Sequence, residues 1–394
     1  MSAPLYIHDF ALCSALGSDK KSIWQALKNG TRPPFVQKMF RAKERYVVEI
    51  PPSSLPQVND PYYDNHVNRL SEEVLSQMED SIRSAVKEYG ADRIGVFIGS
   101  SDNGSEASLA GLDSFQKTGA YPKNYELKMQ QADFAAEFIA KRFGLTGPIF
   151  THSSACASSA SAFASARNWI ESGFCDAAIV GGVDIATETV VLGFDSLEAV
   201  SLEPTIPFSK NRTGLTIGDG AAYFLISKNP GKALFKVIGI GESADADHVT
   251  APRADGEGAV QAIEKALEDA GISASDIDYI NLHGTGTKLN DAMESVAVNR
   301  VFGNDTPASS TKGLTGHTLG AAGALEAAFC CLTLSEENME KALPVHFFDG
   351  ERDSSIPQIR LVNAGETVKR LNICMSNSFG FGGCNVSLIL SRNV

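Results

Sequence analysis

Short runs of apolar residues alternate with longer amphipathic segments along this chain, which is the pattern of strands alternating with helices. The clearest helix is predicted over residues 258–271, where Val260, Ile263 and Leu267 recur at helical spacing and Gly271 is placed to end it. The predicted strands lie at residues 93–100, 176–184, 221–228, 233–241, 278–284, 371–376 and 385–391. The alternation predicts an α/β fold with parallel or mixed sheets that are covered by helices.

The pattern is interrupted near the middle of the chain by a strong turn, Asn229, Pro230 and Gly231. A second succession of strands and helices begins directly after this turn. We therefore predict two domains of similar build, an N-terminal half at residues 1–230 and a C-terminal half at residues 231–394. Functional side chains are expected where strands end, because in α/β folds these ends face a crevice.

Charge and hydropathy argue against a nucleic-acid-binding protein and against a membrane span. The 394 residues carry a net charge of −13, which argues against nonspecific binding of nucleic acid. The most apolar stretch, residues 319–334, is short and contains Glu326, so we expect a buried helix and no membrane span. The N-terminus has no signal-peptide pattern. The seven cysteines show no CxxC or Cys/His ligand spacing, which predicts reduced thiols, no metal site and a cytoplasmic location.

One cysteine lies in an unusual setting, the sequence SSACASS at residues 153–159. Small residues continue to Ala166, so Cys156 is predicted at the start of a helix that packs closely on its neighbours. The helix dipole and the unpaired N–H groups at such a position lower the pKa of a thiol, which is typical of a nucleophile. The alternative is a small buried side chain, which is the usual role of a free cysteine.

Two histidines follow in glycine-rich segments. His283 ends a predicted strand and opens the sequence HGTGT, and His317 lies within TKGLTGHTLGAAG at residues 311–323. Histidines at such positions are suited to donate a hydrogen bond to a developing oxyanion, although for either one taken alone a polar loop is the better explanation. Lys312 lies near His317, and we predict that it pairs with Glu294 on the helix that follows HGTGT.

The last segment, NSFGFGGCN at residues 377–385, connects two predicted strands and is therefore a poor phosphate loop. Together, the four motifs in this order resemble those of the elongating β-ketoacyl-[acyl carrier protein] synthases, over essentially the whole chain and including PFSKNRTGLTIGDGA at residues 207–221. The resemblance implies the thiolase fold, in which two similar α/β halves form a five-layered α-β-α-β-α core, usually in a dimer.

The resemblance also implies a role for each motif residue. Cys156 corresponds to the nucleophile that accepts the acyl chain as a thioester. His283 and His317 correspond to the pair that promotes decarboxylation of the malonyl extender and stabilises the enolate. Lys312 and Glu294 correspond to a supporting ion pair.

The remaining implied roles concern the substrate. The backbone N–H groups of Cys156 and Phe381 are expected to form the oxyanion hole, and Thr285 and Thr287 to hold the phosphopantetheine arm. The residues expected at the acyl pocket and its gate are Leu215, Phe379 and Phe381. The implied reaction is a decarboxylating Claisen condensation with malonyl-[acyl carrier protein], which extends the chain by two carbons and needs no metal or redox cofactor.

Two departures from the family pattern favour a specialised ketosynthase of a polyketide or aryl polyene pathway over the main fatty-acid enzyme. Leu215 stands where the family usually has phenylalanine, and the loop at residues 101–119 differs from that of the housekeeping enzymes. The expected partners are an acyl carrier protein and a second subunit, in a homodimer or a heterodimer. An acidic carrier requires a basic patch near the tunnel mouth, for which the candidates are Lys123, Lys128 and Arg212.

Three other kinds of protein in this superfamily are alternatives, and the same residues distinguish them. A non-catalytic chain-length subunit would lack the cysteine, and the presence of Cys156, His283 and His317 argues against it. The active half of a ketosynthase/chain-length-factor heterodimer, active only with its partner, stays an open alternative. A thiolase acting on coenzyme A esters would use a second cysteine as base, for which Cys384 is the candidate, but the His317 motif fits the Cys-His-His arrangement better. An initiating ketosynthase would have asparagine in place of one histidine.

Overall fold

A ten-stranded mixed sheet organises the computed structural model, which describes residues 3–102 and 104–393. Its strands, in spatial order, are β11 (Ala308–Ser309), β10 (Tyr279–Asn281), β12 (Ile373–Phe379), β13 (Cys384–Arg392), β9 (Phe235–Ala244), β1 (Leu5–Ser14), β8 (Gly220–Ser227), β6 (Ala177–Asp184), β4 (Ile94–Gly99) and β5 (Ile149–His152). All seven predicted strands are present within this sheet, with shifts of a few residues at their ends.

The sheet consists of two half-sheets with the same topology. The strand order β1-β8-β6-β4-β5 in the first half-sheet corresponds to β9-β13-β12-β10-β11 in the second, with antiparallel pairs first and parallel pairs at the outer edge in both. A short antiparallel pairing of β1 with β9, from Leu5 opposite Val237 to Ile7 opposite Phe235, joins them. The predicted division into domains at residue 230 stays a prediction.

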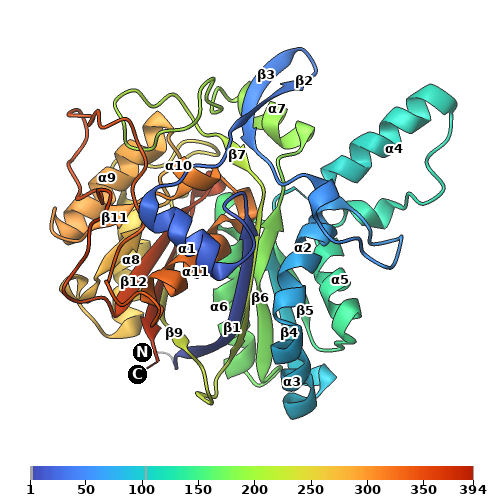
Figure 1. Cartoon of the computed structure of the whole chain (residues 1–394), viewed down its shortest axis with the longest axis horizontal. Helices are drawn as coiled ribbons and strands as arrows, with labels where there is room; N and C mark the ends of the chain where they lie inside the picture. Colours follow the sequence, from blue (N-terminus) through green and yellow to red (C-terminus); the bar gives the residue numbers. More distant parts are fainter. Residues whose placement is uncertain (1–2, 103, 394) are drawn as a thin grey trace.

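Helices form three layers around the half-sheets, as Figure 1 shows. The central layer is α6 (Ser158–Glu171) and α11 (Ala322–Leu334), which contact each other and strands of both half-sheets. The outer layers are α2 (His66–Gln77), α3 (Glu79–Tyr89) and α5 (Phe134–Phe143) on one side, and α8 (Glu257–Ala270) and α9 (Lys288–Phe302) on the other. The predicted five-layered α-β-α-β-α arrangement is therefore confirmed.

Small residues allow the two central helices to approach each other. Ser and Ala make up most of the buried face of α6, together with Phe163 and Ile170, and every residue of α11 is buried. A Cβ atom at Gly323 would lie 2.8 Å from the Cβ of Ala160, closer than carbon atoms pack without a shift. The stretch at 319–334 is thus a buried helix, although its first residues form a 3-10 turn, η6 (Leu319–Ala321), before α11 begins.

The remaining elements lie outside the layers. The hairpin β2 (Val36–Phe40) and β3 (Lys43–Val48) forms a small sheet with β7 (Ile217–Gly218) beside α7 (Glu188–Ser196). Helix α4 (Ser105–Thr118), within the loop that departs from the family pattern, projects from the body of the molecule (Figure 1). The other two helices are α1 (Lys20–Asn29) and α10 (Lys312–Thr315).

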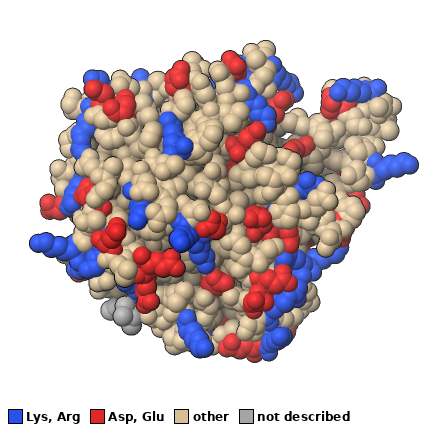
Figure 2. Space-filling model, viewed as in Figure 1, with Lys and Arg blue, Asp and Glu red and all other residues tan. Residues whose placement is uncertain are grey.

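The surface carries charges of both signs. Lysine and arginine side chains are interspersed with aspartate and glutamate over the face in Figure 2, and no large basic area appears on it. Within residues 3–102 and 104–393, no helix has the length and apolar character that crossing a bilayer requires.

Candidate active site

The nucleophile candidate lies in a tight turn between β5 and α6. Cys156 is buried in the 3-10 turn η4 (Ala155–Ala157), and α6 follows directly at Ser158. Ala155 has a φ of 50°, in the left-handed region that few residues other than glycine adopt. The β12–β13 connection packs on this turn, since a Cβ at Gly380 would lie 3.3 Å from the backbone nitrogen of Cys156. The predicted position at the N-terminal end of a buried helix is confirmed.

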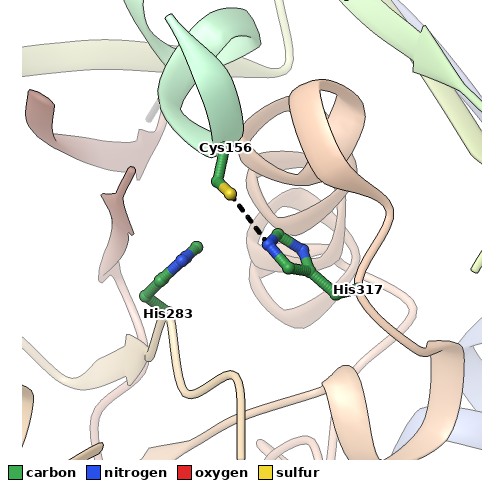
Figure 3. A group of neighbouring side chains, drawn as sticks. All are labelled: Cys156, His283 and His317. Atoms are coloured by element: carbon green, nitrogen blue, oxygen red, sulfur yellow. Dashed lines mark hydrogen bonds between the residues drawn. The ribbon is translucent and has the colours of Figure 1, made fainter. Parts of the chain in front are cut away.

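Three side chains from distant segments meet at this turn (Figure 3). The Nε2 atom of His317 lies 3.0 Å from the Sγ of Cys156. The ring of His283, at the end of β10, is nearly perpendicular to that of His317, with ring centres 5.3 Å apart. One sulfur or nitrogen atom of each residue lies within 4.8 Å of the others. The structure therefore brings together the cysteine and both histidines that the sequence singles out.

The backbone fixes the position and the tautomer of His317. Its N–H donates to the carbonyl of Thr216 at 2.7 Å, and its carbonyl accepts from the N–H of Gly218 at 3.0 Å. The N–H of Leu319 donates to Nδ1 of the ring at 3.3 Å. Because Nδ1 accepts, the hydrogen of the neutral ring lies on Nε2, which faces Cys156.

Lys312 fixes the tautomer of His283 in the same way. Its ammonium group lies 3.4 Å from Nδ1 of the ring and donates to the carbonyl oxygen of His283 at 2.6 Å. An ammonium group has only donors, so Nδ1 accepts and Nε2 carries the hydrogen. Both imidazoles consequently present an N–H toward the space above the thiol.

The predicted pairing of Lys312 with Glu294 is wrong. The carboxylate that pairs with Lys312 is Glu326, on α11, and both side chains are fully buried. Glu294 instead accepts from the backbone N–H groups of His283 and Gly284, at 2.7 and 2.6 Å, and holds the end of β10. Sequence reasoning missed Glu326, although its signal was visible as the one charged residue in an apolar helix.

Burial controls the protonation of these groups. Desolvation lowers the pKa of His283 and of His317 well below the usual value, with Lys312 acting in the same direction, so both rings are neutral near pH 7. Desolvation raises the pKa of Glu294 to about 8 and that of Glu326 to about 7. Burial therefore favours the neutral form of both histidines and of both carboxyl groups, and the two neutral imidazoles act as hydrogen-bond donors through Nε2.

The expected low pKa of the nucleophile is not observed. Burial raises the pKa of Cys156 to about 11, against the opposing effects of the Lys312 charge and of the backbone N–H groups of Phe381 and Cys156. The expectation rested on the helix N-terminus alone, whereas removal of the thiol from water is the larger effect. The resting thiol is therefore protonated at neutral pH.

The Nε2–H groups of His283 and His317 make this site a poor metal site. Three atoms of Cys156, His283 and His317 lie close enough to share an ion. A zinc ligand histidine, however, must offer an unprotonated nitrogen, and the Nε2 atoms here carry hydrogens that the contacts of Leu319 and Lys312 hold in place. The arrangement suits an anion better than a cation.

A cavity of about 400 Å³ opens onto the thiol. Its lining includes the predicted gate residues Leu215, Phe379 and Phe381, as well as Thr285 and Thr287, the predicted arm-binding pair. The two threonine hydroxyls lie 3.0 Å apart, and Thr287 also caps α9. Sequence reasoning missed the wall formed by Phe194 of α7, whose ring centre lies 5.4 Å from that of Phe381.

Of the three candidates for a basic patch near the cavity mouth, the structure contradicts one, Arg212. Arg212 is buried and donates to Asp353 at 2.6 Å. Lys128 pairs with Glu137 at 2.6 Å, and neither it nor the exposed Lys123 lines the cavity. Arg212 fails because sequence alone does not reveal which charges are buried, whereas a patch that includes Lys123 and Lys128 stays a prediction.

Comparisons with known proteins identify relatives of the whole chain. Family models of the beta-ketoacyl synthase N-terminal and C-terminal domains match residues 10–230 and 234–346. A curated relative from Staphylococcus aureus (strain COL), 3-oxoacyl-[acyl-carrier-protein] synthase 2, is 30% identical over 403 residues, covering 96% of each chain. The ketosynthase ApeO of Xenorhabdus doucetiae, solved with its chain length factor ApeC, has a TM-score of 0.92 and 38% identity, covering 99% of this chain and 98% of that chain. The ishigamide ketosynthase/chain length factor has a TM-score of 0.87 and 25% identity over 100% of both chains.

Proposed function

Because this chain belongs to the β-ketoacyl synthase family, we propose that it is a 3-oxoacyl-[acyl carrier protein] synthase with Cys156, His283 and His317 as its catalytic residues. Its fold is the thiolase fold that the sequence predicts, and its chemical class is that of an acyltransferase that condenses acyl units. The observation that supports the residue roles is the meeting of one thiol with two imidazole N–H donors at the inner end of a cavity.

The first step loads the acyl chain. The sulfur of Cys156 attacks the carbonyl of the acyl-carrier thioester, and the thiol proton leaves with the sulfur of the carrier. The N–H groups of Cys156 and Phe381 stabilise the tetrahedral oxyanion. Thr285 and Thr287 hold the phosphopantetheine arm within the cavity. Because the resting thiol is protonated, deprotonation is coupled to attack on a bound thioester.

The second step forms the carbon–carbon bond. Malonyl-carrier loses carbon dioxide, and the electrons of the broken bond form an enolate whose oxygen accepts hydrogen bonds from Nε2 of His283 and of His317. The enolate carbon attacks the thioester on Cys156, the carbon–sulfur bond breaks, and the thiolate is released. Decarboxylation supplies the nucleophilic electron pair, so the proposed step uses no metal or redox cofactor.

A second candidate is the same chemistry in a heterodimer that is active only with a chain-length-factor partner. The 38% identity with ApeO, which was solved in such a complex, favours it. Leu215, buried in the cavity wall where the family usually has phenylalanine, supports a specialised polyketide or aryl polyene pathway over the main fatty-acid pathway. A thiolase is disfavoured, because Cys384 is not among the described residues that line the cavity. The cytoplasm stays the predicted location.

Intact mass spectrometry tests the proposal. The protein is incubated with acyl carrier proteins bearing chains of several lengths or an aryl group, and then with malonyl-carrier. We expect an acyl adduct that Cys156→Ala prevents and that malonyl-carrier discharges into an extended product on the carrier. An adduct on the alanine variant would overturn the assignment of the nucleophile. An adduct that forms only after a chain-length factor is added would establish the heterodimer.

A further inference from the structure

We propose that Asp184 is a positioning residue for the condensation step, because its buried carboxylate holds the histidine turn, residues 317–321. The inference rests on the proposed function, since it concerns the second step of that reaction. Asp184 ends β6 and is fully buried, and it is not among the described residues that line the cavity. It therefore acts through the groups that it holds and not by contact with the substrate.

The carboxylate of Asp184 accepts hydrogen bonds from two segments that lie far apart in the chain. The loop after β4 supplies the backbone N–H and the hydroxyl of Ser101, at 2.9 and 2.8 Å from Oδ2. The same loop supplies the hydroxyl of Ser100 at 2.7 Å and the N–H of Asp102 at 3.2 Å, both to Oδ1. The histidine turn supplies the N–H of Gly320, which donates to Oδ2 at 2.6 Å. One buried carboxylate therefore joins the loop after β4 to the histidine turn.

The histidine turn lies directly against this carboxylate. A Cβ atom at Gly320 would lie 2.7 Å from Oδ2 of Asp184 and 2.9 Å from the backbone nitrogen of Ser101. A Cβ atom at Gly182, two residues before Asp184, would lie 3.1 Å from the Cα of Ala321. Real Cβ atoms do not approach other atoms as closely as 2.7 Å without a shift. The two glycines thus leave room for the turn to rest on the end of β6.

The hydrogen bond to Gly320 fixes the peptide group that follows Leu319. Leu319 has a φ of 53°, and a residue other than glycine keeps such a value only where its surroundings hold it. The N–H of Leu319 donates to Nδ1 of His317 and so keeps the hydrogen of the ring on Nε2. Without the carboxylate, rotation about the backbone of Leu319 would release this contact, and the Nε2–H group would no longer be held toward the enolate oxygen.

The charge of Asp184 has a second effect, on the thiol. Burial and the neighbouring Asp102 raise the pKa of Asp184 to about 6, so the group is ionised at neutral pH. Burial raises the pKa of Cys156, the charge of Asp184 adds to this, and the charge of Lys312 opposes it. The two histidine rings that face the thiol are neutral. The contact of Asp184 with the histidine turn and its charge therefore act on different groups, and substitutions can separate them.

Two variants test the contact. Asp184→Asn keeps the size of the side chain, but its amide can no longer accept hydrogen bonds at both ends. Gly320→Ala keeps the carboxylate and displaces the histidine turn, because the new Cβ would meet Oδ2. We expect both variants to form the acyl adduct on Cys156, seen by intact mass. In both, kcat for condensation should fall about 10–100-fold while KM for malonyl-carrier stays within about threefold, because a misplaced donor affects the transition state.

Alkylation of Cys156 by iodoacetamide tests the charge. In Asp184→Asn the rate at neutral pH should rise at least about threefold, because a negative charge near the thiol is removed. In Gly320→Ala the rate should stay within about twofold of the parent protein, since the carboxylate remains. Cys156→Ser gives the background from the other cysteines. A purely structural role for Asp184 would not produce this difference between the two variants.

The matched control is Asp278→Asn, at the start of β10. This buried carboxylate also holds backbone N–H groups, those of Asn372 and Ile373 at 2.7 and 3.0 Å, and it lies at the end of the strand away from His283. The substitution should lower the free energy of unfolding but leave the rates of condensation and of alkylation within about twofold.

The outcomes separate this inference from the proposed function. Absence of both the acyl adduct and the extended product in the parent protein would refute the proposed function. An adduct in the parent protein together with parental condensation in Asp184→Asn would refute the inference alone. Parental condensation in Gly320→Ala would refute it as well, in a protein that retains the carboxylate. An equal loss of condensation in Asp278→Asn would reduce Asp184 to a general contribution to stability.

Discussion

The turn after β5 and the turn after β11 occupy equivalent places in the two half-sheets, and each carries one of the proposed catalytic groups at the start of a central helix. In both turns a residue with positive φ opens a 3-10 helix, Ala155 with φ 50° before Cys156 and Leu319 with φ 53° after His317. Both lead directly into α6 or α11. A duplicated framework thus delivers a thiol from one half and an imidazole from the other.

The two turns differ in how they are held. The nucleophile turn is fixed by near neighbours: the N–H of Ser154 donates to Ser158 Oγ at 2.9 Å, and Ala157 N–H donates to Ser154 at 3.2 Å. The histidine turn is fixed from the other half of the chain. Thr216 and Gly218, at and next to β7, hold His317, and the buried carboxylate of Asp184 accepts from Gly320 N–H at 2.6 Å.

The comparison indicates that contacts between adjacent residues hold the first turn, whereas contacts from residues far away in the chain hold the second. The position of Cys156 depends on a few consecutive small residues, whereas that of His317 depends on correct packing of the two halves. Changes in the second turn are therefore expected to affect the reaction through its geometry while the thiol remains loaded.

The largest expected effect separates the two steps of the reaction. His317→Ala should still form the acyl adduct on Cys156, but condensation should fall by about 10²–10⁴-fold, because the enolate loses one hydrogen-bond donor. His283→Ala should behave in the same manner. Adduct formation is followed by intact mass and condensation by product on the carrier. Condensation at the parental rate from a preloaded His317→Ala protein would contradict this role.

The second prediction concerns the buried charge that supports the histidines. Glu326→Ala should lower the free energy of unfolding by about 3–5 kcal/mol, because the Lys312 ammonium is left buried without its partner. Combining Glu326→Leu with Lys312→Met should recover most of this loss, since neither charge then remains. Chemical denaturation measures both.

The matched control exchanges the partner. Adding Lys312→Met to Glu294→Leu should not recover the free energy of unfolding that Glu294→Leu alone removes. Glu294 accepts from the backbone N–H groups of His283 and Gly284, and Lys312 pairs with Glu326. Recovery in this pair, and not in the Glu326 pair, would restore the pairing that the sequence suggests.

Predictions from the sequence succeed for features that adjacent residues determine, and they fail for features that depend on contacts between distant segments. The strands, α8 and the position of Cys156 depend on periodicity and on adjacent small residues, and these predictions are confirmed. The partner of Lys312 and the exposure of Arg212 depend on packing between segments that lie far apart in the chain. The predicted pair with Glu294 is wrong, and Arg212 is buried and cannot belong to a surface patch. The two carboxylates Glu294 and Glu326 illustrate the limit, because both are buried near Lys312 and only the packing of α11 decides which one pairs.

The electrostatics of the thiol show a similar limit. The sequence indicates a helix N-terminus, which lowers a pKa, but the extent of burial that raises the pKa of Cys156 to about 11 depends on α11, β12 and the β12–β13 connection together. A local motif therefore gives the correct residue and the wrong net direction of its pKa shift.

The third prediction measures that direction. Since the thiolate is the reactive form and the pKa of Cys156 is about 11, the rate of alkylation by iodoacetamide should rise about tenfold per pH unit from pH 7 through pH 9 and beyond. An unshifted thiol would level off near pH 8.5. Cys156→Ser gives the background from the other cysteines. A plateau below pH 8 would show that the helix dipole and Lys312 outweigh desolvation.

The smallest expected effect compares the two strained residues directly. Ala155→Gly removes the cost of a left-handed conformation, about 1 kcal/mol. Glycine also loses more conformational entropy on folding than alanine, which costs a similar amount, so the free energy of unfolding should change by less than about 1 kcal/mol. Leu319→Gly should instead destabilise the protein by about 2–4 kcal/mol, because the side chain is buried beside Leu215. Thermal and chemical unfolding of the two variants measure the difference. Equal losses would mean that the two turns are held alike, whereas a small change at Ala155 alone would show that the nucleophile turn holds its own geometry.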